Sequence, residues 1–467
     1  MHDDTKVITD LIEQAAEKAR REVAAEPEPE LTRPIQWPVT CTVGPGLEGA
    51  ISCETKIGYV NGAKGWLIYR GYDIFDLCAC CSFEEVAWLL LHGDLPDADE
   101  LKGFRAKLND YFRLPKTTRL LMGFPVETMN PMAALRMGTI LMRQEFTFVD
   151  QDAAKPKTTT AISADEDSIP METTPTGEEH AIYEFRTGRG RPRPRSAGKA
   201  MQDTTGLESC YHLLAGVATL AGVVSRVRNG KLPVEPDPTL SFAGNFLYMM
   251  TGKRPTPIEA RVMDVAMILH ADHGMNASTF AAMVVASTLS DVYFAIGSGI
   301  AALNGPLHGG ANEAVLHMLR EIGSADNVAA WYADARARKQ KVMGFGHRVY
   351  KAYDPRARVL QPLAQFLAEG DHGVGELLGT ANALCDTVVR ELGAKKGIFP
   401  NVDFYSGLVY TALGIPPVMF TTVFAVARVS GWTARVQEYL INNRIFRPRA
   451  MYTGPFDRTV GERKTGG

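Results

Sequence analysis

The sequence has too few cysteines and too little net charge for several common classes of protein. Seven cysteines in 467 residues do not form a disulfide framework, and the cluster of Cys78, Cys80 and Cys81 lacks the paired spacing of a zinc site. A formal net charge of −3 gives no general attraction to nucleic acid or to anionic lipid. We therefore expect reduced thiols in a cytoplasmic protein, with no metal, no nucleic-acid partner and no membrane.

Membrane-spanning runs, targeting segments and several catalytic motifs are also missing. Residues 280–303 are long and apolar, but Asp291 near their centre would cost about 3 kcal/mol in lipid, so we interpret them as a buried helix. Residues 1–23 contain no apolar signal-peptide core and too many acids for a mitochondrial transit peptide. The chain has no phosphate-binding loop, no glycine-rich nucleotide fingerprint and no serine or cysteine nucleophile motif.

Helical periodicity covers most of the remaining sequence and predicts an all-α fold. A short amphipathic helix over residues 5–23 precedes a proline-rich linker, and β-rich runs on either side of Asn61-Gly62 predict one small hairpin. Ser82 and Glu85 predict a capping box at the start of the next helix.

Two further helix boundaries have clear sequence signals. Gly93 is predicted to end the helix that begins at Ser82. Thr256 is predicted to cap a later helix with Glu259 in its first turn, and Gly274 is predicted to end it.

Residues 146–200 interrupt the helical pattern. They are rich in threonine, proline and acid, and the arginine-rich run 186–195 lies near their end. Little in such a segment can bury apolar surface, so we predict a flexible insertion. The arginine run could bind RNA or an acidic partner, and a solvated loop explains the same residues.

Polar residues near helix ends in the C-terminal half are the candidate functional residues. They are His273, His308, His347, Asp403 and Arg428. The structural alternative is a core histidine for His273 and a tight turn for His308. It is a turn with solvated charges for His347 and a helix cap for Asp403. Arg428 is different, because it lies inside an apolar helix and needs a carboxylate partner from the protein or from a ligand. Together these residues favour a small polycarboxylate substrate, with proton transfer beside a carbonyl group.

Five segments carry a resemblance to a known family. KVMGFGHRVYKAYDPRA, GPLHGGANEAV, ILHADHGMNAS, FPNVDFYSG and RPRAMYTG resemble the signature segments of the citrate synthase family. The resemblance extends from about residue 40 to about residue 455, without the insertion. It implies an all-α, citrate-synthase-like fold and an enzyme that condenses acetyl-CoA with oxaloacetate and water to give citrate and CoA.

The resemblance also implies a role for each matching residue. Asp403 would be the base that removes a methyl proton from acetyl-CoA. His273 would hydrogen-bond the thioester oxygen, and His347 would hydrogen-bond the oxaloacetate carbonyl and act as an acid.

Three arginines would hold the carboxylates of oxaloacetate and citrate. They are Arg356, Arg428 and Arg447. In the family, the arginine that matches Arg447 reaches in from the neighbouring subunit, which implies an obligate homodimer.

Coenzyme A enters as part of the thioester substrate, and no tightly bound cofactor is implied. Lys351 and Lys396 match positions that meet CoA phosphates in relatives. The backbone from Val342 through Gly344 to Gly346 resembles the segment that recognises adenine.

The family's architecture predicts a large domain, a small domain that closes over the site, and an N-terminal addition. The N-terminal helix and linker would be residues 1–37. The large domain would combine residues 38–274, which contain the insertion, with residues 415–467, and the small domain would be residues 275–414.

One departure from the family keeps alternatives open. Many members have a substrate-binding histidine near the helix that here reads LSFAGNFLYMM, and this segment has none. The chain could be a 2-methylcitrate synthase that uses propionyl-CoA, because one methylene changes pocket discrimination by only about 1 to 3 kcal/mol. A third interpretation is an inactive homologue that acts as a binding protein through its arginine-rich insertion.

Overall fold

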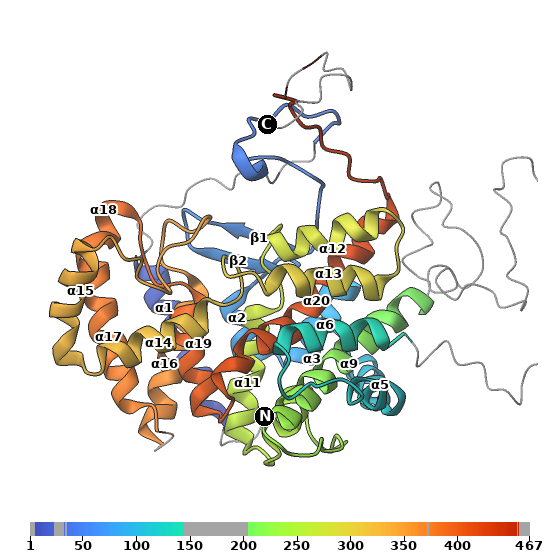
Figure 1. Ribbon diagram of the computed structural model, residues 1–467, viewed down its shortest axis with the longest axis horizontal. Coiled ribbons are helices and arrows are strands. Elements are labelled where there is room, and N and C mark those ends of the chain that lie inside the picture. The colour runs from blue at the N-terminus through green and yellow to red at the C-terminus, as the bar shows by residue number, and fades with distance from the viewer. Residues whose placement is uncertain are drawn as a thin grey trace, which may run out of the picture.

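The computed structural model of this chain describes residues 5–22, 32, 35–143, 204–370, 373–454 and 456. The predicted insertion at 146–200 and its arginine-rich run lie outside these residues. In the described part, helices dominate and one small antiparallel sheet is present (Figure 1), which confirms the predicted all-α class.

The first half of the chain contains an N-terminal helix, the sheet and the first helices of the larger helical body. In chain order these elements are α1 (Lys6–Glu22), η2 (Pro45–Leu47), β1 (Gly58–Asn61), β2 (Trp66–Tyr69), β3 (Tyr72–Asp73), α2 (Ile74–Cys80), α3 (Phe83–His92), α4 (Ala98–Tyr111), α5 (Pro115–Leu121) and α6 (Pro131–Leu141). The helix predicted over 5–23 is therefore confirmed.

The predicted hairpin forms, but its turn is longer than expected. Asn61 still pairs with Trp66, so four residues connect β1 to β2 instead of the Asn61-Gly62 pair. The Asn61 side chain accepts a hydrogen bond from the backbone N–H of Lys64, which closes this longer turn. β3 adds a third, unpredicted strand in the order β1-β2-β3.

The second half continues with helices that belong to two groups. The elements are α9 (Thr204–Arg228), α10 (Phe242–Thr251), α11 (Pro257–His270), α12 (Ala277–Ser287), α13 (Val292–Leu303), α14 (Ala311–Ile322), η4 (Ala325–Asn327), α15 (Val328–Ala337), α16 (Pro355–Glu369), α17 (Gly375–Val388), the π-turn η5 (Val389–Gly393), α18 (Ala394–Lys396), α19 (Val402–Ala412), η6 (Pro417–Met419) and α20 (Phe420–Ile441). Helices α14 to α19 gather at one end of the molecule (Figure 1).

Three of the four predicted helix boundaries are confirmed. Ser82 and Glu85 form a capping box, and Gly93 ends that helix in a left-handed conformation. Thr256 and Glu259 form a second capping box at the start of α11.

The apolar stretch 280–303 is two helices instead of the one that we expected. Asp291 breaks it, because its carboxylate caps α13 by accepting a hydrogen bond from the N–H of Tyr293. The same buried carboxylate pairs with Arg143, which satisfies its charge inside the fold. Both helices pack against α20.

Helix α20 lies at the centre of the larger helical body. Every residue from Phe420 to Val436 is buried, and the helix packs against α3, α9, α11, α12 and α13. Among the described helices, only Gly206–Arg228 is long and apolar enough to cross a bilayer, and 89% of it is buried inside the fold. Burial by its neighbours identifies this segment as a core helix.

Two extended segments leave the helical body on the same side (Figure 1). One is residues 35–50 and the other is residues 442–454, which follow α20. Large apolar side chains on both segments are exposed, including Trp37, Met451 and Tyr452.

Candidate active site

His273 lies in the loop between α11 and α12, and not at the end of α11 as the sequence predicted. Helix α11 ends at His270, three residues before His273. At this end of the helix the carbonyl of His270, which has no partner within the helix, accepts a hydrogen bond from Arg428 (2.6 Å). The N–H of Gly274, which would otherwise bond to that carbonyl, donates to the carboxylate of Asp272. Gly274 therefore turns the loop, with φ +61°, instead of ending the helix.

His347 lies in a glycine-containing loop that pairs with the segment before α19. The N–H of Gly346 donates to the carbonyl of Phe399 (2.9 Å), and the N–H of Asn401 donates to the carbonyl of Gly344 (2.9 Å). The Asn401 side chain also donates to the carbonyl of Gly346 (3.0 Å). These bonds tie the His347 loop to the start of the helix that carries Asp403.

Asp403 is the second residue of α19, and the residue that caps this helix is Asn401. The Asn401 side chain accepts the N–H of Asp403 (3.0 Å), so the structural alternative of Asp403 as a cap is wrong. Freed from capping, the Asp403 carboxylate has one oxygen, Oδ1, that is buried and has no hydrogen-bond partner. A buried carboxylate oxygen of this kind is available to take up a proton.

The two histidines meet around a buried tyrosine. The ring centroids of His273 and His347 are 5.1 Å apart, and Nε2 of His273 lies 3.2 Å from the hydroxyl of Tyr350. The N–H groups of Val349 and Tyr350 donate to Nδ1 of His347. Neutral His347 therefore carries its proton on Nε2, where it can serve as a hydrogen-bond donor.

Two of the three predicted arginines are buried at this place. Arg356 donates through Nε and Nη2 to both carboxylate oxygens of Asp354, at 3.0 and 2.8 Å. Arg428 donates to the carbonyl of His270 and stacks over the ring of Phe424, and it forms no ion pair with a described residue. Its buried charge is thus left to interact with an anionic ligand.

Burial changes the protonation of all three candidate catalytic groups. It lowers the pKa of His347 to about 4, and the neighbouring charge of Arg356 acts in the same direction. Burial, followed by the charges of Arg356 and His347, lowers the pKa of His273 well below its ordinary value. Burial raises the pKa of Asp403 to about 7, although Arg356 opposes this change. Both histidines are consequently neutral at pH 7.

The remaining candidate residues lie around this centre or away from it. His308 is half-buried, and its Nε2 lies 2.9 Å from the hydroxyl of Ser278. Arg447 is exposed on the segment that follows α20, so its own chain does not bury it at the site. Lys351 and Lys396 are exposed. Among the described residues, no three His, Cys, Asp or Glu side chains are grouped to hold a metal ion.

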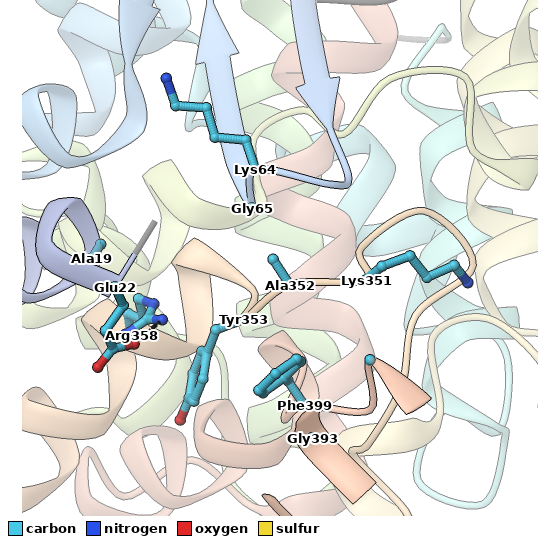
Figure 2. Close-up of a pocket in the computed structure, with 11 residues that line it drawn as sticks. Ala19, Glu22, Lys64, Gly65, Lys351, Ala352, Tyr353, Arg358, Gly393 and Phe399 are labelled. Carbon is cyan, nitrogen blue, oxygen red and sulfur yellow. Dashed lines mark hydrogen bonds and ion pairs between the residues drawn. The ribbon is translucent and has the colours of Figure 1, made fainter. Parts of the chain in front are cut away.

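One cavity of the described residues is lined by none of the catalytic or arginine candidates. A cavity of about 450 Å³ lies between the end of α1, the β1–β2 turn and the loops around residues 351–358 and 393–399. Of the candidate residues, only Lys351 lines it, and Figure 2 shows the Lys351 side chain leading away from Arg358 and Glu22.

Sequence reasoning missed several residues that support this centre. They are Tyr350, Asp354 and Asn401. The contact of Tyr350 with His273 is distant in sequence, whereas Asp354 and Asn401 cap helices and could have been found from the residues that follow them. Arg435 could have been found, because it lies in the same apolar helix as Arg428 and raises the same question of how its charge is satisfied. Its partner is Asp272, the residue before His273.

Comparison with known proteins agrees with this geometry. The family model for the C-terminal domain of citrate synthase matches residues 46–449. The chain is 40% identical over 418 residues to the citrate synthase of Deinococcus radiodurans, covering 89% of this chain and 97% of that protein. It is 36% identical to the citrate/2-methylcitrate synthase of Bacillus subtilis, covering 88% and 96%.

A solved structure extends the likeness to three dimensions. Citrate synthase of Thermoplasma acidophilum, in a ternary complex with carboxymethyl coenzyme A and oxaloacetate, matches with a TM-score of 0.74 and 30% identity. The match covers 91% of this chain and all of that one. The chain therefore belongs to the citrate synthase family and is an acyltransferase of that type.

Proposed function

We propose that His273, His347 and Asp403 carry out the condensation of acetyl-CoA with oxaloacetate in this citrate synthase. The reaction joins the acetyl methyl carbon to the oxaloacetate carbonyl carbon, and hydrolysis of the thioester then gives citrate and CoA. One observation carries the assignment of residues. Two neutral histidines meet around Tyr350, and the two buried arginines near them also act by their charge on a carboxylate whose Oδ1 is buried and unpartnered.

Asp403 is the base that removes the methyl proton. A carboxylate with its ordinary pKa is a weak base for a thioester α-proton, and a pKa of about 7 makes Asp403 a stronger base while leaving much of it ionised at neutral pH. Oδ1 is free to receive the proton because no described group bonds to it.

The histidines stabilise the charge that this proton transfer creates. A preorganised donor at a developing oxyanion contributes typically about 3 to 4 kcal/mol. His273 takes this role at the thioester oxygen. His347 donates from Nε2 to the oxaloacetate carbonyl and gives up that proton as the carbon–carbon bond forms, since its Nδ1 is occupied by two backbone N–H groups.

Arg356 and Arg428 bind the carboxylates of oxaloacetate. Asp354 holds one edge of the Arg356 guanidinium, which leaves the other edge for the substrate. Arg428 has no carboxylate partner among the described residues and fits an anionic substrate directly. Arg447 completes the clamp from a second subunit of a homodimer, which is consistent with its exposure on a segment outside its own helical body.

Coenzyme A binds along the loops at residues 341–351 and 393–397 as part of the substrate, and not as a tightly held cofactor. Lys351 and Lys396 are exposed, so their ammonium groups are accessible to the phosphates of CoA. The carbonyls of Gly344 and Gly346 and the N–H of Gly346 already bond to residues 399–401. Recognition of adenine therefore falls to Val342 and to the backbone groups of this segment that remain available.

A smaller domain closes over the site and excludes water. The predicted limits, 275–414 for the small domain and 38–274 with 415–467 for the large one, remain a prediction. Helices α12 and α13 both pack against α20, and α13 also packs against α6, whereas α14, α16 and α17 all pack on α19. We therefore propose α14 to α19 as the moving unit. The seven free thiols support a cytoplasmic location.

The experiment that tests this assignment follows thiol release from acetyl-CoA with the full-length protein. We expect release only when oxaloacetate is present, and we expect Asp403→Asn to lower it by several orders of magnitude. Omission of oxaloacetate is the matched control. No oxaloacetate-dependent release from folded wild-type protein would contradict the proposed function.

The second candidate is 2-methylcitrate synthase, which is favoured by the similarity to the citrate/2-methylcitrate synthase of Bacillus subtilis. Comparison of kcat/KM for acetyl-CoA and propionyl-CoA decides between the two. We expect acetyl-CoA to be preferred, and a clear preference for propionyl-CoA would establish the alternative. The inactive binding-protein alternative predicts no turnover with either thioester.

A further inference from the structure

One face of helix α20 binds the three successive residues that precede His273. Arg428, Gly431 and Arg435 are spaced by three and four positions, so they form a single stripe on the helix. Arg428 donates to the carbonyl of His270, and the N–H of Gly431 donates to the carbonyl of Ala271 (3.1 Å). Arg435 completes the series at Asp272, the residue immediately before His273.

The Arg435–Asp272 contact is a buried, two-pronged ion pair. Nε and Nη2 of Arg435 each lie 2.7 Å from one oxygen of the Asp272 carboxylate. Asp272 is 0% exposed and Arg435 is 2% exposed. Burial alone would raise the pKa of Asp272, but the charge and hydrogen bonds of Arg435 outweigh it and lower that pKa. The carboxylate is thus fully ionised inside the fold.

Two glycines leave just enough room for this carboxylate. A methyl group added at Gly431 would come within 2.9 Å of Oδ1 of Asp272, and one added at Gly58 would come within 2.8 Å of Oδ2. Such contacts are closer than a carbon atom tolerates. The carboxylate is therefore held by packing on two sides as well as by the arginine fork.

Asp272 fixes the backbone on both sides of His273. Its Oδ2 accepts the N–H of Gly274 (3.1 Å), which follows the histidine. Its own backbone carbonyl accepts the hydroxyl of Tyr69 (2.7 Å), and its N–H donates to the same hydroxyl (3.2 Å). A shift of the Asp272 carboxylate would consequently move the His273 main chain.

We propose that the Arg435–Asp272 pair is a positioning device for His273. The pair does not touch the reacting atoms, and it sets the place from which the His273 ring meets the thioester oxygen. This inference rests on the proposed function. A displacement of about 1 Å at a catalytic group can cost about a hundredfold in rate, so the pair acts on turnover and not only on stability.

Arg435→Gln in the full-length protein tests the proposal, because glutamine can still donate one hydrogen bond to Asp272 but cannot form the fork. We expect kcat per folded molecule to fall about tenfold to a hundredfold. The KM for oxaloacetate should change by less than about threefold, because Arg356 and Arg428 remain in place. Arg435→Lys, which keeps the charge without the fork, should have an intermediate kcat.

The matched control is Arg143→Gln, which breaks a second buried Arg–Asp pair, with Asp291, away from the candidate site. We expect a similar fall in Tm and an unchanged kcat. If Arg435→Gln loses Tm as the control does but keeps kcat within twofold, the pair is only structural and the proposal is wrong. If Arg435→Gln does not fold, Arg435→Lys decides by the same criterion. Absence of wild-type thiol release would overturn the proposed function instead.

Discussion

Asp403 combines two properties that have one cause in a protein interior: one of its oxygens is buried without a partner, and burial raises its pKa to about 7. A carboxylate in such a place costs folding free energy because its charged form is poorly solvated. The unfavourable burial falls on Asp403, the residue that we propose as the base.

The rate of reaction should follow the ionisation of Asp403. The base acts only when deprotonated, so kcat/KM for acetyl-CoA should fall about tenfold for each pH unit below about 7 and level off above it. A pH profile of kcat/KM measures this directly. A profile that stays flat between about pH 5.5 and pH 7 would contradict the role of Asp403 as the base.

The ionisation of Asp403 that raises the rate should lower the stability of the folded protein. The pKa of Asp403 in the folded protein, about 7, lies above the ordinary value of 3.8. Folding therefore carries a penalty that is absent below pH 3.8, grows as the pH rises, and is complete above pH 7. We expect Asp403→Asn to have a higher Tm than wild type at pH 8, with the difference shrinking toward pH 4. Equal Tm differences at both pH values would contradict this.

At the scale of elements, Asn401 joins the loop of His347 to the helix of Asp403. It caps α19 and donates to the carbonyls of Gly344 and Gly346. Asn401→Ala should lower the free energy of unfolding by about 1 kcal/mol through the lost cap. It should also reduce kcat, because the bond from the Asn401 side chain to the Gly346 carbonyl is lost and only the backbone bonds still tie the His347 loop to α19.

Asn130→Ala provides the comparison, since Asn130 caps α6 in the same way but has no link to the site. We expect a similar loss of stability there without a loss of kcat. Measurement of unfolding free energy and kcat for both variants separates the two effects. Equal kcat values would show that Asn401 only caps its helix.

The His347 loop also depends on a glycine that has no room for a side chain. Gly344 and Gly346 both have φ +79°, a conformation that costs an ordinary residue about 1 to 2 kcal/mol. A methyl group at Gly344 would lie 2.7 Å from Val315 and 2.8 Å from Phe404, whereas at Gly346 it would meet nothing within 4 Å. Gly344→Ala should therefore lower Tm clearly more than Gly346→Ala. Thermal unfolding of the two variants tests this, and equal Tm values would contradict the packing.

At the scale of the whole molecule, the proposed homodimer makes each active site a product of two chains. Asp403→Asn and Arg447→Ala proteins should each be nearly inactive. Mixed and allowed to exchange subunits, they should recover activity at about a quarter of the wild-type sites, because half of the dimers are mixed and each has one intact site. A mixture with proven exchange and no recovery would mean that Arg447 does not act across the interface.

The sequence by itself determined the helices and the chemical character of the site. Helix starts such as Ser82 and Thr256 depend on bonds between residues three or four positions apart, so the local pattern contains them. The buried position of Arg428 also followed from the pattern, because a charge inside an apolar helix can be recognised without knowing its partner. The roles of His273, His347 and Asp403 came from the resemblance to a family and not from periodicity.

Only the tertiary structure decided how these residues are held. Arg435 and Asp272 are 163 positions apart, and nothing local indicates that they meet. The carbonyl of His270 at the end of α11 is likewise satisfied by Arg428, which is 158 positions away. Such contacts are set by the packing of helices that are distant in sequence, so no local pattern contains them.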